Sequence, residues 1–211
     1  METGADVELT PEESLRIIMR TMGQARRELI MPDGPIARAW GVAVVIGFGS
    51  MALIWGTGLY RHRAPADAFT GAVWFVAVAV ALVYSSRKGK AYYSPEGGGV
   101  WSPVMSRLLW IWVLGIALAA GTAVAAGLSV EGVAALIAFF VAAVYVMSGI
   151  LCFDNVETVT GLWIGAVNAS ALPLGRTAYA VAMAILAGGG LIVSGYLDDR
   201  RWARVTAAAA R

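Results

Sequence analysis

The stretch AWGVAVVIGFGSMALIWGTGLY, residues 39–60, decides the fold of this chain because it contains no charged side chain. The apolar core of a bilayer is about 30 Å thick, and about 20 apolar residues in an α-helix cross it. This stretch therefore predicts a transmembrane helix. The whole chain has the same character, with 59% hydrophobic and 14% charged residues, whereas ordinary soluble domains have roughly half and roughly a quarter.

Five more stretches are long and apolar enough to cross a membrane. The six predicted spans are residues 39–60, 69–86, 108–128, 133–153, 156–174 and 177–197. They leave room for one bundle and no second domain, with a segment 1–38 before it and a short basic tail, 198–211, after it. The sequence thus predicts an all-α fold, a polytopic membrane protein with six transmembrane helices preceded by a cytoplasmic amphipathic helix.

The basic residues are distributed unevenly between the two sides of these spans. Thirteen of the 16 Lys and Arg residues precede the first span, lie between the second and third, or follow the last. Because loops rich in Lys and Arg stay in the cytoplasm, both chain termini are expected there. The abundance of alanine, glycine, valine and arginine favours a GC-rich bacterial genome, so the expected location is the bacterial inner (plasma) membrane. The polar segment before the first span is atypical of a cleaved secretory signal.

The segment before the first span begins with a helix start signal. Thr10 supplies a hydroxyl at the N-cap, Pro11 takes the first helical position, and Glu13 can return a hydrogen bond to the cap. At about 100° per residue, the residues that follow divide into an apolar face and a basic face. The apolar face carries Leu15, Ile18, Met19, Met22, Ala25 and Leu29, and the other face carries Arg16, Arg20, Gln24 and Arg27.

Three roles for this helix are open. It can lie in the cytoplasmic headgroup layer with its arginines near anionic lipid, which needs only this composition and position. Its apolar stripe can instead pack on a partner helix or on a second copy of the chain. It can also be a solvated lead-in. Arg26 lies among the apolar residues, which favours the interfacial role because an arginine stem can reach toward water.

A polar stripe marks the fifth predicted span, in the stretch FDNVETVTGLWIGAVNAS, residues 153–170. Spacings of three and four place its polar and small residues on one side of a helix. These residues are Asp154, Glu157, Thr158, Gly161, Gly165 and Asn168. At a rise of 1.5 Å per residue, Asn168 is expected about 16 Å from Glu157, near the membrane midplane, with both carboxylates at the cytoplasmic edge.

This stripe has two interpretations. The first is helix packing, because glycines permit close approach and an asparagine can bond across helices. The second is a polar path or ligand pocket entered from the cytoplasm, in which Asp154 and Glu157 attract cations or protons, while Thr158 and Asn168 contact the ligand. The glycine run 188–190 in the sixth span likewise indicates either close packing or a hinge.

The sequence offers little for catalysis. His62 is the single histidine and Cys152 the single cysteine, which excludes paired-histidine haem ligation, an internal disulfide and a cysteine-based metal site. The sequence has no Gly-Lys-Ser or Gly-Lys-Thr phosphate loop, so any use of ATP requires a separate subunit. We expect neither enzymatic activity nor a metal ion or cofactor.

Three stretches carry a resemblance, namely TPEESLRIIMRTMGQARREL (10–29), GVAVVIGFG (41–49) and YAVAMAILAGGGLIVSGYL (179–197). Together they resemble poorly characterised six-span bacterial integral membrane proteins with an N-terminal amphipathic helix, over nearly the whole chain. That resemblance implies a cytoplasmic partner, since such proteins are often encoded beside transcription regulators or transporter components. The layout is also similar to export-type ABC transporter permeases, although the outer loop LPLGR (172–176) is shorter than the re-entrant elements of those permeases.

Two functions follow as expectations. The first is a membrane component of small-molecule transport, in the direction of export, that works with a cytoplasmic ATPase subunit at the opening helix and the loop 87–107. The second is a membrane-embedded sensor or anchor that holds a transcription regulator. The lipid bilayer is a partner that both functions share, self-association is compatible with both, and direct nucleic-acid binding is expected of neither.

Overall fold

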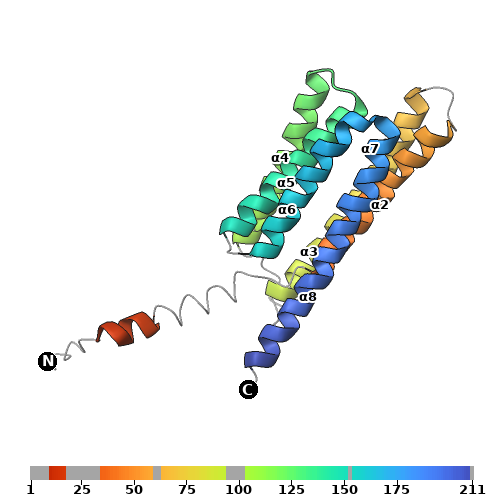
Figure 1. Cartoon of the computed structure of the whole chain (residues 1–211). Coiled ribbons are helices and arrows are strands. Elements are labelled where there is room, and N and C mark those ends of the chain that lie inside the picture. Colours follow the sequence, from red (N-terminus) through yellow and green to blue (C-terminus); the bar gives the residue numbers. More distant parts are fainter. Residues whose placement is uncertain (1–9, 18–33, 59–62, 94–102, 152–153, 210–211) are drawn as a thin grey trace. The chain divides into compact units, whose positions relative to one another are not determined.

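The structure is a computed structural model that describes residues 10–17, 34–58, 63–93, 103–151 and 154–209 (Figure 1). These residues are almost entirely helical, and no strand occurs among them. The chain divides into two units, Met1–Met31 and Pro32–Arg211.

The described part of the first unit is a helix over residues 11–17. Its predicted start signal is confirmed, because the Glu13 backbone N donates to Thr10 Oγ1 at 3.2 Å and the Thr10 backbone N donates to Glu13 Oε2 at 3.0 Å. Two hydrogen bonds lower the pKa of the Glu13 carboxyl, and the bond from the Thr10 backbone has a larger effect than the bond from the Thr10 hydroxyl. Leu15 and Arg16 are exposed within this unit. The other predicted contact residues of the helix, Ile18, Met19, Arg20, Met22, Arg27 and Leu29, lie outside the described residues.

The second unit is built from long helices that run back and forth (Figure 1). The first five are α2 (Gly34–Thr57), α3 (Arg63–Tyr93), α4 (Pro103–Ala125), α5 (Val130–Leu151) and α6 (Asn155–Ala171). After a short 3-10 turn, η1 (Leu172–Leu174), the chain returns through α7 (Arg176–Ala182), a π-helical segment η2 (Met183–Gly188) and α8 (Gly189–Ala209). The segments α7, η2 and α8 follow one another directly and together form the C-terminal rod.

Two glycines in the left-handed conformation set helix ends at the loops. Gly127, at φ 68°, closes α4, and the backbone N of Leu128 donates back to the carbonyl of Ala123 at 3.0 Å. This pattern satisfies carbonyl groups that a helix end leaves without partners. Gly175, at φ 88°, stands between η1 and α7. Because other residues adopt this conformation only with strain, the glycines fix where the chain turns.

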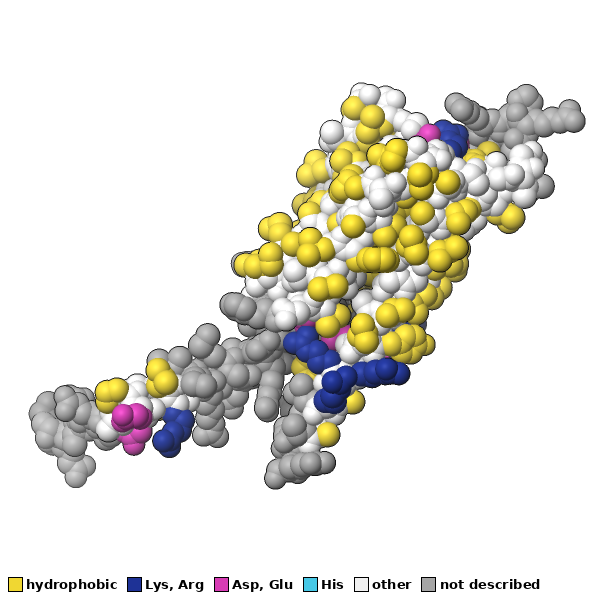
Figure 2. Space-filling model, viewed as in Figure 1, with side chains coloured by type: hydrophobic (Ala, Val, Ile, Leu, Met, Phe, Trp, Pro, Cys, Tyr) yellow, Lys and Arg dark blue, Asp and Glu magenta, His cyan; other side chains and the backbone are white. Residues whose placement is uncertain are grey.

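Among the described residues of the second unit, four helical segments are long and apolar enough to cross a membrane, namely Gly34–Thr57, Ala66–Gly89, Val130–Leu151 and Arg176–Arg204. They coincide with the first, second, fourth and sixth predicted spans. Helices also occupy the third and fifth predicted spans, as α4, whose part Trp110–Ala125 is a shorter apolar helix, and α6, which has 17 residues. Large apolar side chains are exposed over the visible face of the bundle (Figure 2). The described chain is therefore all-helical and has the long, apolar, uncovered helices of a membrane protein.

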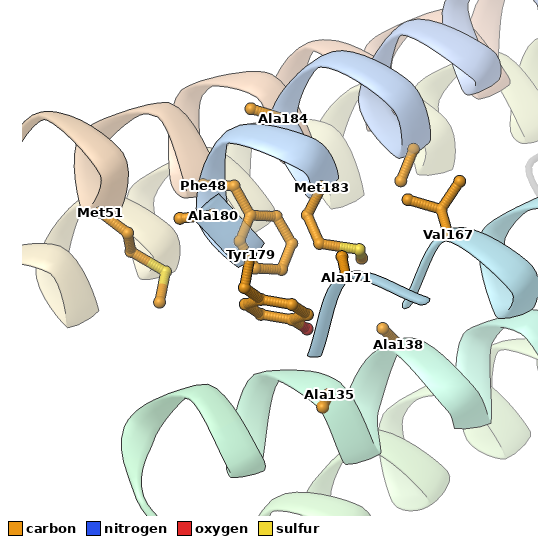
Figure 3. Close-up of a cluster of buried hydrophobic side chains, with 11 residues drawn as sticks. Phe48, Met51, Ala135, Ala138, Val167, Ala171, Tyr179, Ala180, Met183 and Ala184 are labelled. Carbon is orange, nitrogen blue, oxygen red and sulfur yellow. The ribbon is translucent and has the colours of Figure 1, made fainter. Parts of the chain in front are cut away.

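The helices of the second unit pack in two groups. Helix α2 packs against α3 and the C-terminal rod, and α5 packs against α4 and α6. Helix α6 also packs against the rod, which joins the two groups. The main buried cluster includes Phe48, Met51, Tyr179 and Met183 (Figure 3). The rings of Phe48 and Tyr179 meet edge to face with centroids 5.7 Å apart, a favoured aromatic geometry.

Candidate functional site

The polar side of α6 begins with Asp154 at the N-cap. Its Oδ1 accepts hydrogen bonds from the backbone N of Val156 at 2.8 Å and of Glu157 at 3.4 Å. Its Oδ2 accepts from Arg201 Nη1 on α8 at 2.7 Å. Asp154 is only 5% exposed. One buried carboxylate therefore caps the start of α6 and binds it to the middle of α8.

Helix α8 also holds the start of α2. The carboxylate of Asp198 is buried, and its Oδ2 accepts a hydrogen bond from the backbone N of Gly34 at 3.1 Å. Gly34 is the first residue of α2, where exposed N–H groups and the helix dipole favour a negative charge. The next residue, Asp199, forms an ion pair with Arg38 of α2. The Arg38 guanidinium also lies over the ring of Tyr196, 4.7 Å from its centroid.

These contacts come from one turn in the middle of α8, residues 198–201. We call this set of contacts the α8 clasp, and its members are Asp198, Asp199 and Arg201 with their partners Gly34, Arg38 and Asp154. Figure 2 shows acidic and basic side chains gathered at the lower end of the bundle. The sequence indicated residues 198–211 only as a basic tail, whereas the structure continues α8 through this segment to Ala209. The sequence signal that could have indicated these contacts is LDDRR (197–201), in which an acidic and a basic residue lie three positions apart, as on one face of a helix.

The other two members of the predicted stripe near Asp154 lie in the first turn of α6. The Thr158 hydroxyl donates to the Asp154 carbonyl at 2.9 Å, a bond back along its own helix. Glu157 is half-buried. The structure thus places Asp154, Glu157 and Thr158 together, as the spacing predicted.

Asn168 lies far from these residues, near the other end of α6. It is 0% exposed. Its Nδ2 donates to the Ala135 carbonyl on α5 at 3.0 Å, and its Oδ1 accepts from the Tyr179 hydroxyl on α7 at 2.8 Å. One side chain therefore links α5, α6 and α7. Figure 3 shows Tyr179 among the buried apolar residues, close to Ala135.

Helix α6 ends earlier than the predicted fifth span. The span was predicted to continue to residue 174, whereas α6 ends at Ala171. The reason is local, because Pro173 cannot donate a backbone hydrogen bond and Gly175 turns the chain. Within α6 and its N-cap, Asp154 and Asn168 are separated by about 21 Å of helix, at 1.5 Å per residue.

A second set of polar contacts lies next to Asn168. Arg176 Nη2 donates to Glu131 Oε2 at 2.7 Å, which connects α7 to the start of α5. The Arg176 guanidinium also lies over the Trp55 ring of α2, 4.7 Å from its centroid. The sequence indicated Arg176 only as an outer-loop charge, because nothing in the local pattern reveals a partner 45 residues away.

Between these two ends, α6 contacts the π-helical part of the rod. The indole Nε1 of Trp163 donates to the carbonyl of Leu186 within η2 at 2.8 Å. A π-helical turn departs from the regular bonding of an α-helix, and such turns occur often at functional sites. Helix α6 is thus held to the rod at its start, at its middle and near its end.

Comparison with protein-family models, curated proteins and solved structures gives no match to this chain. The fold and the polar contacts therefore assign this chain to a structural class and not to a family. The class is a helical membrane protein whose apolar helices are joined by polar contacts at both ends. Within the described ranges, no group of three or more His, Cys, Asp or Glu residues is placed to hold a metal ion.

Proposed function

We propose that this chain is a six-span protein of the bacterial inner membrane with both termini in the cytoplasm. Helices occupy all six predicted spans, and the 17 residues of α6 meet the lower limit of about 17 for a crossing. The clasp joins the start of α2 to α8, and among the described residues Arg38, Arg200, Arg201 and Arg204 lie on these two helices near it, which supports its cytoplasmic placement.

Within that membrane placement, we propose a role as a membrane component of small-molecule transport, in the direction of export, with a cytoplasmic ATPase partner. The observation that carries this proposal is η2, a π-helical segment in the middle of the rod, between the α8 clasp and the contacts of Tyr179 and Arg176. Such segments are points where a helix can bend. Opening of the clasp would let α8 move away from α6 and admit water to Asp154 and Glu157.

In the structure, the rod packs closely against α2 and α6. Asp154 and Asn168 are buried, and Gly188 and Gly190 each approach a neighbouring helix. An added Cβ at Gly188 would lie 2.7 Å from the Val45 side chain, and one at Gly190 would lie 2.7 Å from Trp163 Nε1. Transport therefore requires a second arrangement, and the proposal predicts that breaking the clasp populates it.

Thiol labelling tests this prediction in a Cys152→Ser background. Ile164, buried against Leu191 of α8, is replaced by cysteine, and labelling by a membrane-impermeant maleimide is followed in intact membranes. We expect labelling to rise by at least about tenfold when Arg201→Met opens the clasp, because each ~1.4 kcal/mol of lost interaction shifts a two-state equilibrium about tenfold.

Two controls accompany the labelling. A cysteine at Leu162, on the exposed apolar face of α6, should stay unlabelled because lipid surrounds it, and a cysteine at Ala180, buried in the main cluster, should stay unlabelled unless the bundle unfolds. Unchanged labelling at Ile164 after the clasp is broken would contradict a water-filled pathway.

A membrane-embedded sensor or anchor for a cytoplasmic regulator is the second candidate. The observation that favours it is the use of the Asn168 amide and carbonyl groups for helix contacts with Ala135 and Tyr179, which suits a packed scaffold better than a ligand pocket. In this case, deletion of residues 9–30 should leave a folded bundle that no longer retains a DNA-binding protein during purification in mild detergent. Retention of that DNA-binding protein by the shortened chain would contradict the anchor proposal. Co-purification of an ATPase with the full chain would favour the transport role.

A further inference from the structure

A groove of about 690 Å³ runs between α2 and α3. Its floor is formed by small buried residues, Ala43, Ala77 and Ala81. Larger exposed residues stand beside them, namely Val42, Ile46, Val76 and Val80. Because a floor of alanines lies between taller valine and isoleucine side chains, the surface is concave as well as apolar.

The groove has the length of one bilayer leaflet. Along α3 its lining residues recur every three or four positions from Val73 to Tyr84, which places them on one face. Eleven residues of helix span about 16 Å, close to half of the roughly 30 Å apolar core. Beyond Ile46, the Trp74 ring lies on Gly47 so closely that an added Cβ would come within 2.3 Å of it. Direct contact between α2 and α3 therefore closes this end.

Positive charge marks the other end of the groove. The face of α3 that carries Tyr84 continues three and four residues later with Arg87 and Lys88, both exposed. Lys88 Nζ lies 5.9 Å from the centroid of the Tyr84 ring. Arg38 lines the same end from α2, but Asp199 balances its charge. Among the described residues at this end, Arg87 and Lys88 are the cations for which no ion pair occurs.

We propose that this groove binds one acyl chain of an anionic phospholipid, whose headgroup phosphate lies against Arg87 and Lys88. Within the bilayer, a flexible hydrocarbon chain that fills a concave apolar surface gains van der Waals contacts with its walls. Basic sites between transmembrane helices on the cytoplasmic side select anionic headgroups. The inference rests on the membrane placement proposed above, but it does not depend on a transport role.

Native mass spectrometry of the full chain, purified in mild detergent and offered phosphatidylglycerol or phosphatidylcholine, tests the proposal. The wild-type chain should retain phosphatidylglycerol in preference. Replacing both Arg87→Gln and Lys88→Gln should reduce that preference about fivefold for each lost charge. Ala77→Leu, which fills the floor of the groove, should reduce retention of both lipids because the acyl chain no longer fits between α2 and α3.

The matched control is the double variant Arg200→Gln and Arg204→Gln, which removes two exposed arginines from α8 instead. It should keep the lipid preference of the wild type. An equal loss in this control, equal retention of the two lipids by the wild type, or a lipid-free dimer whose groove a second copy covers would overturn the proposal. Thiol labelling of a cysteine at position 87 reports the membrane orientation separately, so an inverted topology is distinguishable from the absence of a lipid site.

Discussion

Replacing Gly161 with alanine should destabilise the bundle, whereas the same change at Gly165, one turn away on α6, should be tolerated. A Cβ at Gly161 would lie 2.7 Å from both the Ala142 carbonyl O and the Val146 backbone N of α5. These are backbone atoms, so no side-chain rotation can relieve the overlap and α5 must move. Overpacking of this kind costs about 1–3 kcal/mol.

Gly165 is a close control for this prediction. An added Cβ there would lie 3.5 Å from the Ala142 Cβ, which is an ordinary van der Waals contact. Alanine also favours a helix over glycine by about 0.5–1 kcal/mol, so Gly165→Ala should be neutral or slightly stabilising. The free energy of unfolding of each variant in mixed detergent micelles measures the difference. Equal stability of the two variants would show that α5 and α6 do not approach each other at Gly161.

This contrast reflects how helices associate when lipid is the solvent. Lipid tails are as apolar as leucine, so burial of apolar side chains gives little drive for one helix to meet another. Close approach at small residues and a few polar bonds must supply it. Gly161 allows the close approach between α5 and α6, and Asn168 provides polar bonds where α5, α6 and α7 meet.

The helical class and the positions of the long apolar helices could be predicted from the sequence for a physical reason. In a bilayer every backbone N–H and C=O must be bonded within the chain, so a stretch such as 39–60 has helix as its main option. The cap at Thr10 could be predicted as well, because its two partners are three residues apart.

The polar contacts between helices could not be predicted in the same way. The spacing of Asp154, Glu157 and Thr158 shows that they share a face, but not which helix that face meets. Asp154 binds Arg201, 47 residues away, and Asp198 binds Gly34, 164 residues away. Local periodicity carries no information about such partners, and the same limit applies to Arg176 and Glu131.

From the geometry of the clasp, we expect Arg201→Met to lower the free energy of unfolding of the bundle by about 3 kcal/mol. The Asp154 side chain is only 7% exposed, so the loss of its cationic partner leaves a buried negative charge without compensation. Breaking a buried pair in this way costs about 3–5 kcal/mol, and the partial exposure of Arg201 favours the lower value. Unfolding in mixed micelles measures the loss. Arg200→Met, the same chemical change at an exposed neighbour, should have almost no effect.

The double variant with Asp154→Asn separates the lost charge pair from a general loss of packing. Asparagine is a good N-cap residue, so the start of α6 keeps an acceptor for the backbone N–H groups of Val156 and Glu157. It carries no charge, so removal of Arg201 then leaves nothing uncompensated. We therefore expect Asp154→Asn to restore most of the stability that Arg201→Met removes, with a coupling energy of about 1–3 kcal/mol between the two sites. A double variant no more stable than Arg201→Met alone would mean that the stem of Arg201, rather than its charge, holds α8 against α6.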